Sequence, residues 1–425
     1  MTNFSAEVHQ NQYLPVGGTR VDAIVRVTAR GDGARGTPSG HRAEVLIIDC
    51  SGSMRMPRSK IKAARTATAA AIDCIDDGVA FAVLAGTHQV RQVFPDAGRL
   101  ALANDGTRAV ARAAVAGLDA RGGTAMGRWL AYADELFARE LDGIHHAILM
   151  TDGLDQDETP DELQTVLQHC AGHFQCDCRG VGDDWDVDEL RNISSALLGS
   201  VDIVANPSDA KAMAADFEAM MHSAIGKAVA DVALRIWTPR GAAVEFVKQV
   251  HPTIEDLTGR RTTVSDLVGS YPTGAWGEEL RDFHVRITVP ARDLGDEMLA
   301  GRVSLVVDDQ VISEAKLLAV WTDDLALSTR IDAEVARADG NAELAEAIQG
   351  GVRAWEAGDH DTATTLLGRA VQLADAAGDE SRLDELRALV RIEDAAAGTV
   401  VIRPNVDRVA AMTVDTHSTK TVLRG

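Results

Sequence analysis

The stretch Val45-Leu46-Ile47-Ile48-Asp49-Cys50-Ser51-Gly52-Ser53-Met54 decides both the fold class and the chemistry of this chain. Its first four residues are continuously apolar, which is typical of a strand buried on both faces of a parallel sheet. The run ends in an aspartate, and two serines follow at two-residue spacing on a turn that contains glycine. Because ligands of open α/β sheets bind at the carboxyl ends of strands, the sequence predicts a polar site here.

Further apolar runs alternate with amphipathic stretches on the C-terminal side of this strand. The runs span residues 79–84, 147–150, 176–181 and 201–204. Between them apolar residues recur at helical spacing, as in Ile61, Ile72 and Ile75. Alternating strands and helices predict a doubly wound, mostly parallel α/β domain over residues 43–227.

The segments on either side of this domain have a different, two-residue periodicity. It is clearest in residues 232–237, 283–289 and 303–307, and it predicts an antiparallel β-sandwich over residues 229–323. Residues 1–35 contain two strand-like stretches, which are too few to form a stable unit alone. We therefore expect residues 1–35 to join this sandwich, so that the α/β domain is an insertion in it. A Gly/Pro/Ser-rich stretch at residues 31–40 is predicted to be the connection.

The C-terminal part is predicted to be helical and then polar. Residues 324–394 are rich in alanine, and residues 354–370 resemble one tetratricopeptide-like helical hairpin. A solenoid needs about three such units, so the prediction is a small helical bundle. Residues 395–425 are predicted to end in a mobile, threonine-rich tail. One hypothesis is that a phosphothreonine in this tail binds a phosphothreonine-reading domain, and the alternative is that the tail only solvates the chain.

Composition restricts the classes of partner and the compartment. With 42 Lys and Arg against 64 Asp and Glu, the formal charge is −22, which argues against nucleic-acid binding. The first residues lack the pattern of a signal peptide, and no apolar stretch approaches the ~20 residues that span a bilayer. The five cysteines are odd in number and lie in apolar surroundings, as reduced core thiols do. We therefore expect a cytoplasmic protein without membrane contact.

Two later segments add oxygen ligands to the site at Asp49. Thr124 lies on a Gly-rich loop before a predicted helix, and Asp152 follows the apolar run at residues 147–150. Carboxylates and hydroxyls without thiolate or imidazole suit a small hard cation. The prediction is Mg²⁺, with Mn²⁺ or Ca²⁺ as alternatives.

Together these three segments resemble the von Willebrand factor type A (VWA) family, of a cytoplasmic bacterial type with a complete metal-ion-dependent adhesion site. The family pattern is Asp-x-Ser-x-Ser, then a threonine on a Gly-rich loop, then an aspartate after a later strand. The matching residues are Asp49, Ser51, Ser53, Thr124 and Asp152. The resemblance implies that the three hydroxyls contact the ion directly and that the two aspartates act partly through water. It also implies that an Asp or Glu carboxylate of a partner protein fills the remaining position.

The sequence favours a binding protein over an enzyme. The site lacks the Gly-x-Ser-x-Gly of a serine hydrolase, and the nearest histidines, His145 and His146, lie at the other end of their strand, roughly 20 Å away. The sequence also contains no phosphate-binding loop of the Gly-x₄-Gly-Lys-Ser/Thr type. Two alternatives stay open: a metal-dependent enzyme or accessory subunit of a chelatase-like ATPase, and a metal-free structural domain whose polar groups only cap helices and turns.

A second group of metal-ligand residue types lies within ten residues. It consists of His169, Cys170, His173, Cys176 and Cys178. Their spacing does not match common zinc sites, and free cysteines are usually buried, so we interpret the thiols as core residues.

Overall fold

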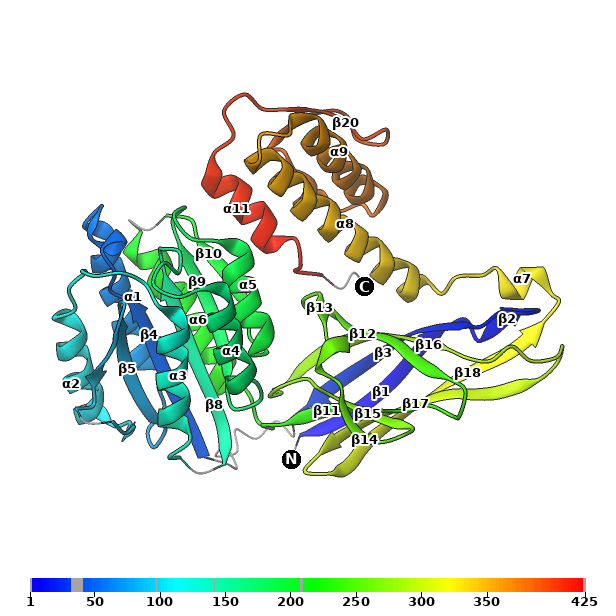
Figure 1. Ribbon diagram of the computed structural model, residues 1–425, viewed down its shortest axis with the longest axis horizontal. Coiled ribbons are helices and arrows are strands. Elements are labelled where there is room, and N and C mark those ends of the chain that lie inside the picture. Colours follow the sequence, from blue (N-terminus) through cyan, green and yellow to red (C-terminus); the bar gives the residue numbers. More distant parts are fainter. Residues whose placement is uncertain (1, 32–40, 97, 141, 207–208, 423–425) are drawn as a thin grey trace. The chain divides into compact units, whose positions relative to one another are not determined.

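The computed structural model describes residues 2–31, 41–96, 98–140, 142–206 and 209–422 (Figure 1). The chain divides into two compact units. The first unit contains Met1–Ala34, Asp231–Asp407 and His417–Gly425, and the second contains Arg35–Ala230 and Arg408–Thr416. Apart from Gly31, the predicted connection at residues 31–40 lies outside the described residues.

The second unit is built on a mostly parallel sheet with the order β10-β9-β8-β4-β5-β6. Its strands are β4 (His41–Asp49), β5 (Ala80–Gly86), β6 (Val90–Phe94), β7 (Ala101–Leu102), β8 (Gly143–Thr151), β9 (Gln175–Val181) and β10 (Val201–Val204). Strand β4 pairs in parallel with both β5 and β8, whereas β6 and β7 pair antiparallel with β5. The predicted doubly wound α/β fold is confirmed.

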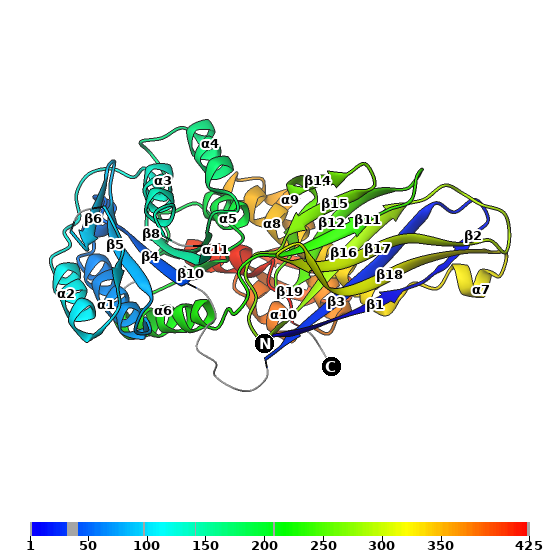
Figure 2. The ribbon, with the colours of Figure 1, turned by 90° about the horizontal axis from the view of Figure 1, so that it is seen from below.

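Helices cover both faces of this sheet (Figure 2). One face carries α1 (Ser59–Cys74), α2 (Asp105–Ala116) and α6 (Ala210–Ile225), and the other carries α3 (Met126–Phe137), α4 (Pro160–Cys170) and α5 (Val187–Ala196). Leu46 and Ile48 of β4 pack in the first core, and Val45 and Ile47 pack in the second. Each buried side chain of this size stabilises the fold by roughly 1.5–3 kcal/mol, which is why the strand is apolar on both faces.

The first unit contains a sandwich of two sheets, which is discontinuous in the sequence. One sheet has the order β1-β3-β16-β12-β13, and the other has the order β14-β15-β11-β17-β18-β2. The first comprises β1 (Asn3–Gln10), β3 (Arg20–Arg30), β12 (Ala243–His251), β13 (Glu255–Asp256) and β16 (Glu279–Thr288). The second comprises β2 (Tyr13–Pro15), β11 (Val232–Trp237), β14 (Thr262–Ser265), β15 (Val268–Pro272), β17 (Glu297–Val307) and β18 (Gln310–Thr322).

The N-terminal strands join this sandwich, as predicted. Strand β3 lies between β1 and β16, with Val25 opposite Phe283. The structure differs from the prediction in one detail, because the short strand β2 pairs in parallel with β18. The sandwich is therefore antiparallel except at this edge.

The helical region of the same unit is a hairpin with additions. Figure 1 shows α8 (Ala333–Glu356) and α9 (His360–Ala376) side by side. In the sequence, the short helix α7 (Leu325–Ser328) precedes them and α10 (Glu380–Leu386) follows them. Residues 390–394, predicted to be helical, instead form β19 (Val390–Asp394), which pairs with β20 (Thr399–Ile402). The turn between these strands contains Gly398 at a φ of +67°, a conformation that favours glycine.

The predicted mobile tail is another difference. Its described residues include β20 and the helix α11 (Arg408–His417), in which Met412 is buried in the core beneath α3–α5. Asp415 of α11 accepts a 2.8 Å hydrogen bond from Arg191. The threonine-rich composition hid the apolar spacing that docks this helix. Because Thr416 and Ser418 are buried, phosphorylation at either residue would require their segment to detach.

Two further sequence features can be placed in the structure. All five cysteines are free thiols, and Cys50, Cys170, Cys176 and Cys178 are buried, as the sequence indicated. In the described ranges no helix is long and apolar enough to cross a bilayer.

Candidate metal centre

The predicted site lies where the chain reverses its direction of winding across the sheet. From β4 the chain continues through α1 to β5 on one side, whereas β8 pairs with β4 on the other side. The loops after β4 and β8 therefore diverge, which creates the crevice in which α/β proteins bind ligands. Asp49 ends β4, and Asp152 directly follows β8.

Asp49 is fully buried and tightly held. The backbone N–H of Ser51 donates to its Oδ1 at 2.7 Å, and the hydroxyl of Thr151 donates to its Oδ2 at 2.5 Å. Burial raises the pKa of Asp49 to about 6, since the loss of hydration and the nearby charge of Asp152 outweigh these hydrogen bonds. The ionised carboxylate is thus destabilised in the absence of a cation.

The three hydroxyls and the second aspartate converge on the same place. Ser51 Oγ lies 2.7 Å from Ser53 Oγ, and Ser53 donates a 2.7 Å hydrogen bond to Asp152 Oδ1. Thr124 is close as well, because a Cβ placed on Gly153 would lie 3.2 Å from Ser53 Oγ and 3.6 Å from Thr124 Oγ1. The structure therefore brings together the residues that the sequence singled out.

Backbone hydrogen bonds fix the loop of Thr124 against the loop after β4. The N–H of Gly52 donates to Gly122 O at 2.9 Å, and the N–H of Arg121 donates to Cys50 O at 2.6 Å. Gly122 has a φ of +95°, which other residues rarely adopt. A Cβ on Gly123 would lie 1.7 Å from Asp157 Oδ2, so a side chain there would displace Asp157. The glycines thus permit this close approach of the loops.

Lys60 is the most informative residue that sequence reasoning missed. Its Nζ lies 2.7 Å from Asp152 Oδ2 and 3.1 Å from Asp184 Oδ2, and its side chain is only 5% exposed. Burial disfavours the ammonium, but the hydrogen bond and charge of Asp152 outweigh it and raise the pKa of Lys60. A signal existed in the sequence, because Lys60 shares the spacing of the buried Ala63, Ala64 and Ala67 on α1.

The sequence analysis also did not identify the acidic loop that follows Asp152 as part of the site. Asp155 accepts the N–H of Met126 at 2.8 Å, and Glu158 accepts the N–H groups of Gly127 and Arg128 at 2.6 and 3.0 Å. These carboxylates cap the N-terminus of α3, where negative charge is favourable. Burial and a hydrogen bond shared with Glu158 raise the pKa of Asp155 to about 7. The loop therefore supports the segment that carries Thr124.

The donor set fits a hard divalent cation. It consists of oxygen atoms from two fully buried carboxylates and three hydroxyls, as Mg²⁺ prefers. A positive charge is already in contact with the site, since the ammonium of Lys60 pairs with Asp152. In the described residues no cluster of three or more His, Cys, Asp or Glu side chains is arranged to hold a metal. An ion at this place would therefore depend on the hydroxyls.

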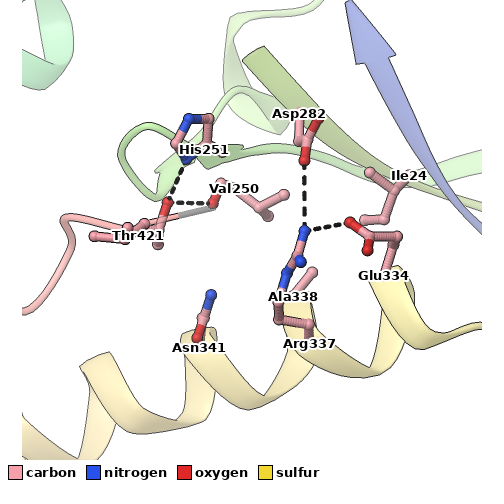
Figure 3. A pocket seen from close by; sticks show the side chains of 10 residues that line it. Ile24, Val250, His251, Asp282, Glu334, Arg337, Ala338, Asn341 and Thr421 are labelled. Carbon is pink, nitrogen blue, oxygen red and sulfur yellow. Dashed lines mark hydrogen bonds and ion pairs between the residues drawn. The ribbon is translucent and has the colours of Figure 1, made fainter. Parts of the chain in front are cut away.

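A hollow in the first unit is a weaker candidate for a ligand site (Figure 3). Arg337 pairs with Glu334 and lies 3.9 Å from Asp282, and Arg26 binds both carboxylates at 2.7 and 2.8 Å. His251 Nδ1 lies 3.2 Å from the hydroxyl of Thr421. Because these charges neutralise one another, the arrangement resembles a structural ion-pair network more than a ligand site.

Known proteins resemble the chain along its whole length. A family model of the von Willebrand factor type A domain matches residues 44–203, and a model of the von Willebrand factor type A C-terminal domain matches residues 372–418. The solved von Willebrand factor type A protein from Catenulispora acidiphila is 47% identical, with 99% of this chain and 97% of that chain covered at a TM-score of 0.94. The chain belongs to the von Willebrand factor type A family. VWA domains often mediate protein–protein interaction or bind a divalent metal.

More distant relatives add information about the fold. An uncharacterized protein of Synechocystis is 26% identical over 299 residues, which are 68% of this chain and 66% of that relative's length. The ArnB paralog VWA2 of Sulfolobus acidocaldarius has a TM-score of 0.58 at 13% identity, with 98% of both chains covered. The human COPII-coat protein Sec24c has a TM-score of 0.56 at 10% identity, with 99% of this chain and 75% of that chain covered. The last two similarities show the fold alone.

Proposed function

We propose that this VWA protein is a divalent-cation-dependent binding protein, whose ion site captures an acidic side chain of a partner protein. The observation that carries the proposal is the convergence of two buried carboxylates and three hydroxyls on loops at the switch point of the sheet. Mg²⁺ suits this donor set best, and Mn²⁺ or Ca²⁺ are alternatives. A bound ion would supply a hard positive centre with a position open to a carboxylate.

The residues of the site have distinct roles in this proposal. Ser51, Ser53 and Thr124 would contact the ion through their hydroxyls. Asp49 and Asp152 would supply the negative charge that balances it, and both are withdrawn from water. The hydrogen bonds of Asp49 to Thr151 and to the Ser51 N–H keep its carboxylate oriented before an ion arrives. Such preorganisation lowers the cost of binding.

We propose a binding role rather than catalysis because the strand histidine that the sequence singled out, His146, is engaged away from the site. His88 lies closer than the sequence indicated, since a Cβ on Gly122 would be 2.8 Å from its Nδ1. His146 is held between Glu44 at 2.8 Å and Asp177 at 3.0 Å. It lies five residues before Thr151 on β8, which is about 17 Å along a strand. General base catalysis requires direct hydrogen-bond contact or one bridging water. This histidine is therefore too far from the candidate ion site to act there.

Calorimetric titration with Mg²⁺ tests the proposal. The unmodified protein is expected to bind the ion, and Asp49→Ala is expected to weaken binding by about a hundred-fold or more, because one of two balancing charges is lost. Asp96→Ala removes an exposed carboxylate and serves as the matched control, with unchanged affinity. A failure of the unmodified protein to bind Mg²⁺, Mn²⁺ or Ca²⁺ would refute the proposal. Capture of a partner that is lost with EDTA and with Asp49→Ala would extend it.

A further inference from the structure

We propose that Lys60 is an internal counter-cation of the ion site, which weakens binding of the divalent ion alone and favours its capture together with an anionic group. This inference rests on the proposed function and concerns its regulation. It names a residue outside the five-residue ion motif, and it makes the ion and the partner's carboxylate depend on each other.

Lys60 is positioned so that its side chain reaches the candidate ion site. The residue lies in the first turn of α1, and its neighbours Ala63 and Ala64 on the same face are buried. The stem is therefore directed into the protein and not into solvent. Its ammonium meets Asp152 Oδ2 at 2.7 Å, while the other oxygen of Asp152 accepts the hydroxyl of Ser53. Lys60 thus faces the same carboxylate that the ion would use.

Lys60 changes the net charge of the buried groups at the site. Asp49 and Asp152 contribute −2 and Lys60 contributes +1, so the set carries −1 without an ion and +1 with a divalent ion. One carboxylate from a partner then brings it to neutrality. Without Lys60 the same three states would carry −2, 0 and −1. Lys60 therefore disfavours binding of the divalent ion alone and favours binding of the anion to the ion-loaded site.

Burial makes this charge difference effective. Asp49 and Asp152 have no exposed surface, and charges in such surroundings are screened far less than charges in water. Asp184, the second partner of Lys60, has a side chain that is 60% exposed, so water weakens its compensation of the ammonium. The ion-loaded site is thus left with a surplus positive charge in a poorly solvated place.

The expected consequence is positive coupling between the ion and the acidic group. An ion alone binds weakly because it must share Asp152 with an ammonium. A carboxylate that neutralises the surplus charge increases the affinity of the site for the ion. By thermodynamic linkage, the ion increases the affinity for the carboxylate by the same factor. The site would release its ion when the partner leaves.

The first measurement is calorimetric titration with Mg²⁺ of the full chain carrying Lys60→Met. The affinity is expected to increase by about ten-fold or more. The matched control is Lys62→Met, which removes an exposed ammonium from the same helix and is expected to change the affinity less than about three-fold. Lys60→Arg keeps the charge and is expected to resemble the unmodified protein.

The second measurement tests how Lys60 affects binding of an anion to the ion-loaded site. The full chain is loaded with Mn²⁺ and titrated with acetate, and water-proton relaxation reports displacement of water from the ion. Lys60→Met is expected to need several-fold more acetate than the unmodified protein. The two effects of one substitution therefore have opposite signs, whereas a mere loss of folding would weaken both.

A second variant covers the case in which Lys60→Met does not fold. Asp184→Asn removes the exposed partner of Lys60 and leaves its ammonium less compensated, so Mg²⁺ is expected to bind several-fold more weakly than in Asp183→Asn, its neighbouring control. Equal affinities of Lys60→Met and the unmodified protein, or of Asp184→Asn and Asp183→Asn, would overturn this inference and leave the proposed function intact. Absence of ion binding in every variant would overturn both.

Discussion

Two polar clusters lie near opposite ends of β4 and β8, and they differ in how their charges are satisfied. Toward the amino ends of β4 and β8, the imidazole of His146 bridges Glu44 and Asp177 at 2.8 and 3.0 Å. Burial opposes a charged imidazole, but the charge of Glu44 and the hydrogen bonds to both carboxylates raise the pKa of His146 to about 10. At the carboxyl ends, the candidate ion site also has two carboxylates for one cation, but its lysine contacts Asp152, whereas Asp49 accepts hydrogen bonds from the Ser51 N–H and the Thr151 hydroxyl.

The difference follows from where the side chains are attached. Glu44 and His146 are register partners across β4 and β8, so the sheet itself places them together. Asp177 on β9 accepts the N–H and the hydroxyl of Ser200, both at 2.7 Å. The groups of the ion site lie at strand ends and on loops, where a surplus of oxygen ligands can remain open to a ligand. Buried charges on strands here hold the fold, whereas those beyond the strands are suited to binding.

The largest effect is expected from breaking the strand cluster. His146→Phe leaves the buried Glu44 and the partly buried Asp177 without their shared partner, which should reduce the free energy of unfolding by about 3–5 kcal/mol. Urea unfolding followed by circular dichroism measures it. His145→Phe is the control, and its free energy of unfolding is expected to stay within about 1 kcal/mol of the unmodified protein. The reason is that the ring of His145 already stacks on Phe137, with 5.0 Å between the ring centroids. Mg²⁺ affinity of the folded His146→Phe protein should be unchanged. A loss below about 1 kcal/mol would mean that this cluster does not stabilise the fold.

Removing a charge from the candidate ion site should increase the free energy of unfolding, which is the opposite of the effect at the strand cluster. The pKa of Asp49 is raised from 3.8 to about 6 in the folded protein, so stability falls as the pH rises from about 4 to 6 and stays reduced above it. In EDTA at pH 7.5, Asp49→Asn should therefore stabilise the protein by about 1–3 kcal/mol. Thermal unfolding across pH 3.5–8 measures the difference, which should vanish below about pH 4. Asp96→Asn should show no such trend, and destabilisation by Asp49→Asn at pH 7.5 would contradict the comparison.

The smallest effect is expected from one hydroxyl of the strand cluster. Ser200→Ala removes the Oγ–H donor to Asp177 but keeps the backbone N–H donor, so the free energy of unfolding should fall by about 1–2 kcal/mol. Mg²⁺ affinity should stay within about two-fold of the unmodified protein. A larger change in ion affinity would show that the two clusters are coupled through the sheet and do not have separate roles.

Much of the fold and the place of the candidate site could be predicted because local patterns carry them. The apolar run at Val45 predicts a strand buried on both faces, and the polar residues that follow it predict a site at the end of that strand. The helix α11 was not predicted because threonines conceal Met412 and its apolar neighbours. The β19–β20 hairpin was not predicted because alanine-rich surroundings favoured helix, although Val390 and Ile392 alternate as strand residues do.

Lys60 shows the limit of such reasoning most clearly. A lysine in an amphipathic helix is ordinarily solvated, and only its spacing with buried alanines indicates otherwise. Nothing in its neighbourhood along the chain names Asp152 as its partner. The same holds for His146, whose two carboxylate partners lie on two other strands.

The sequence by itself determined the parallel sheet, the inserted position of the α/β domain and the set of polar residues at the candidate ion site, because apolar period and motif spacing are local properties. Only the tertiary structure decided which charges meet. Electrostatic energy depends on distances between atoms that are remote in the chain and on their removal from water, and neither is written in the order of residues. The site predicted from five oxygen-bearing side chains contains, in the folded protein, those side chains and a lysine that contacts Asp152.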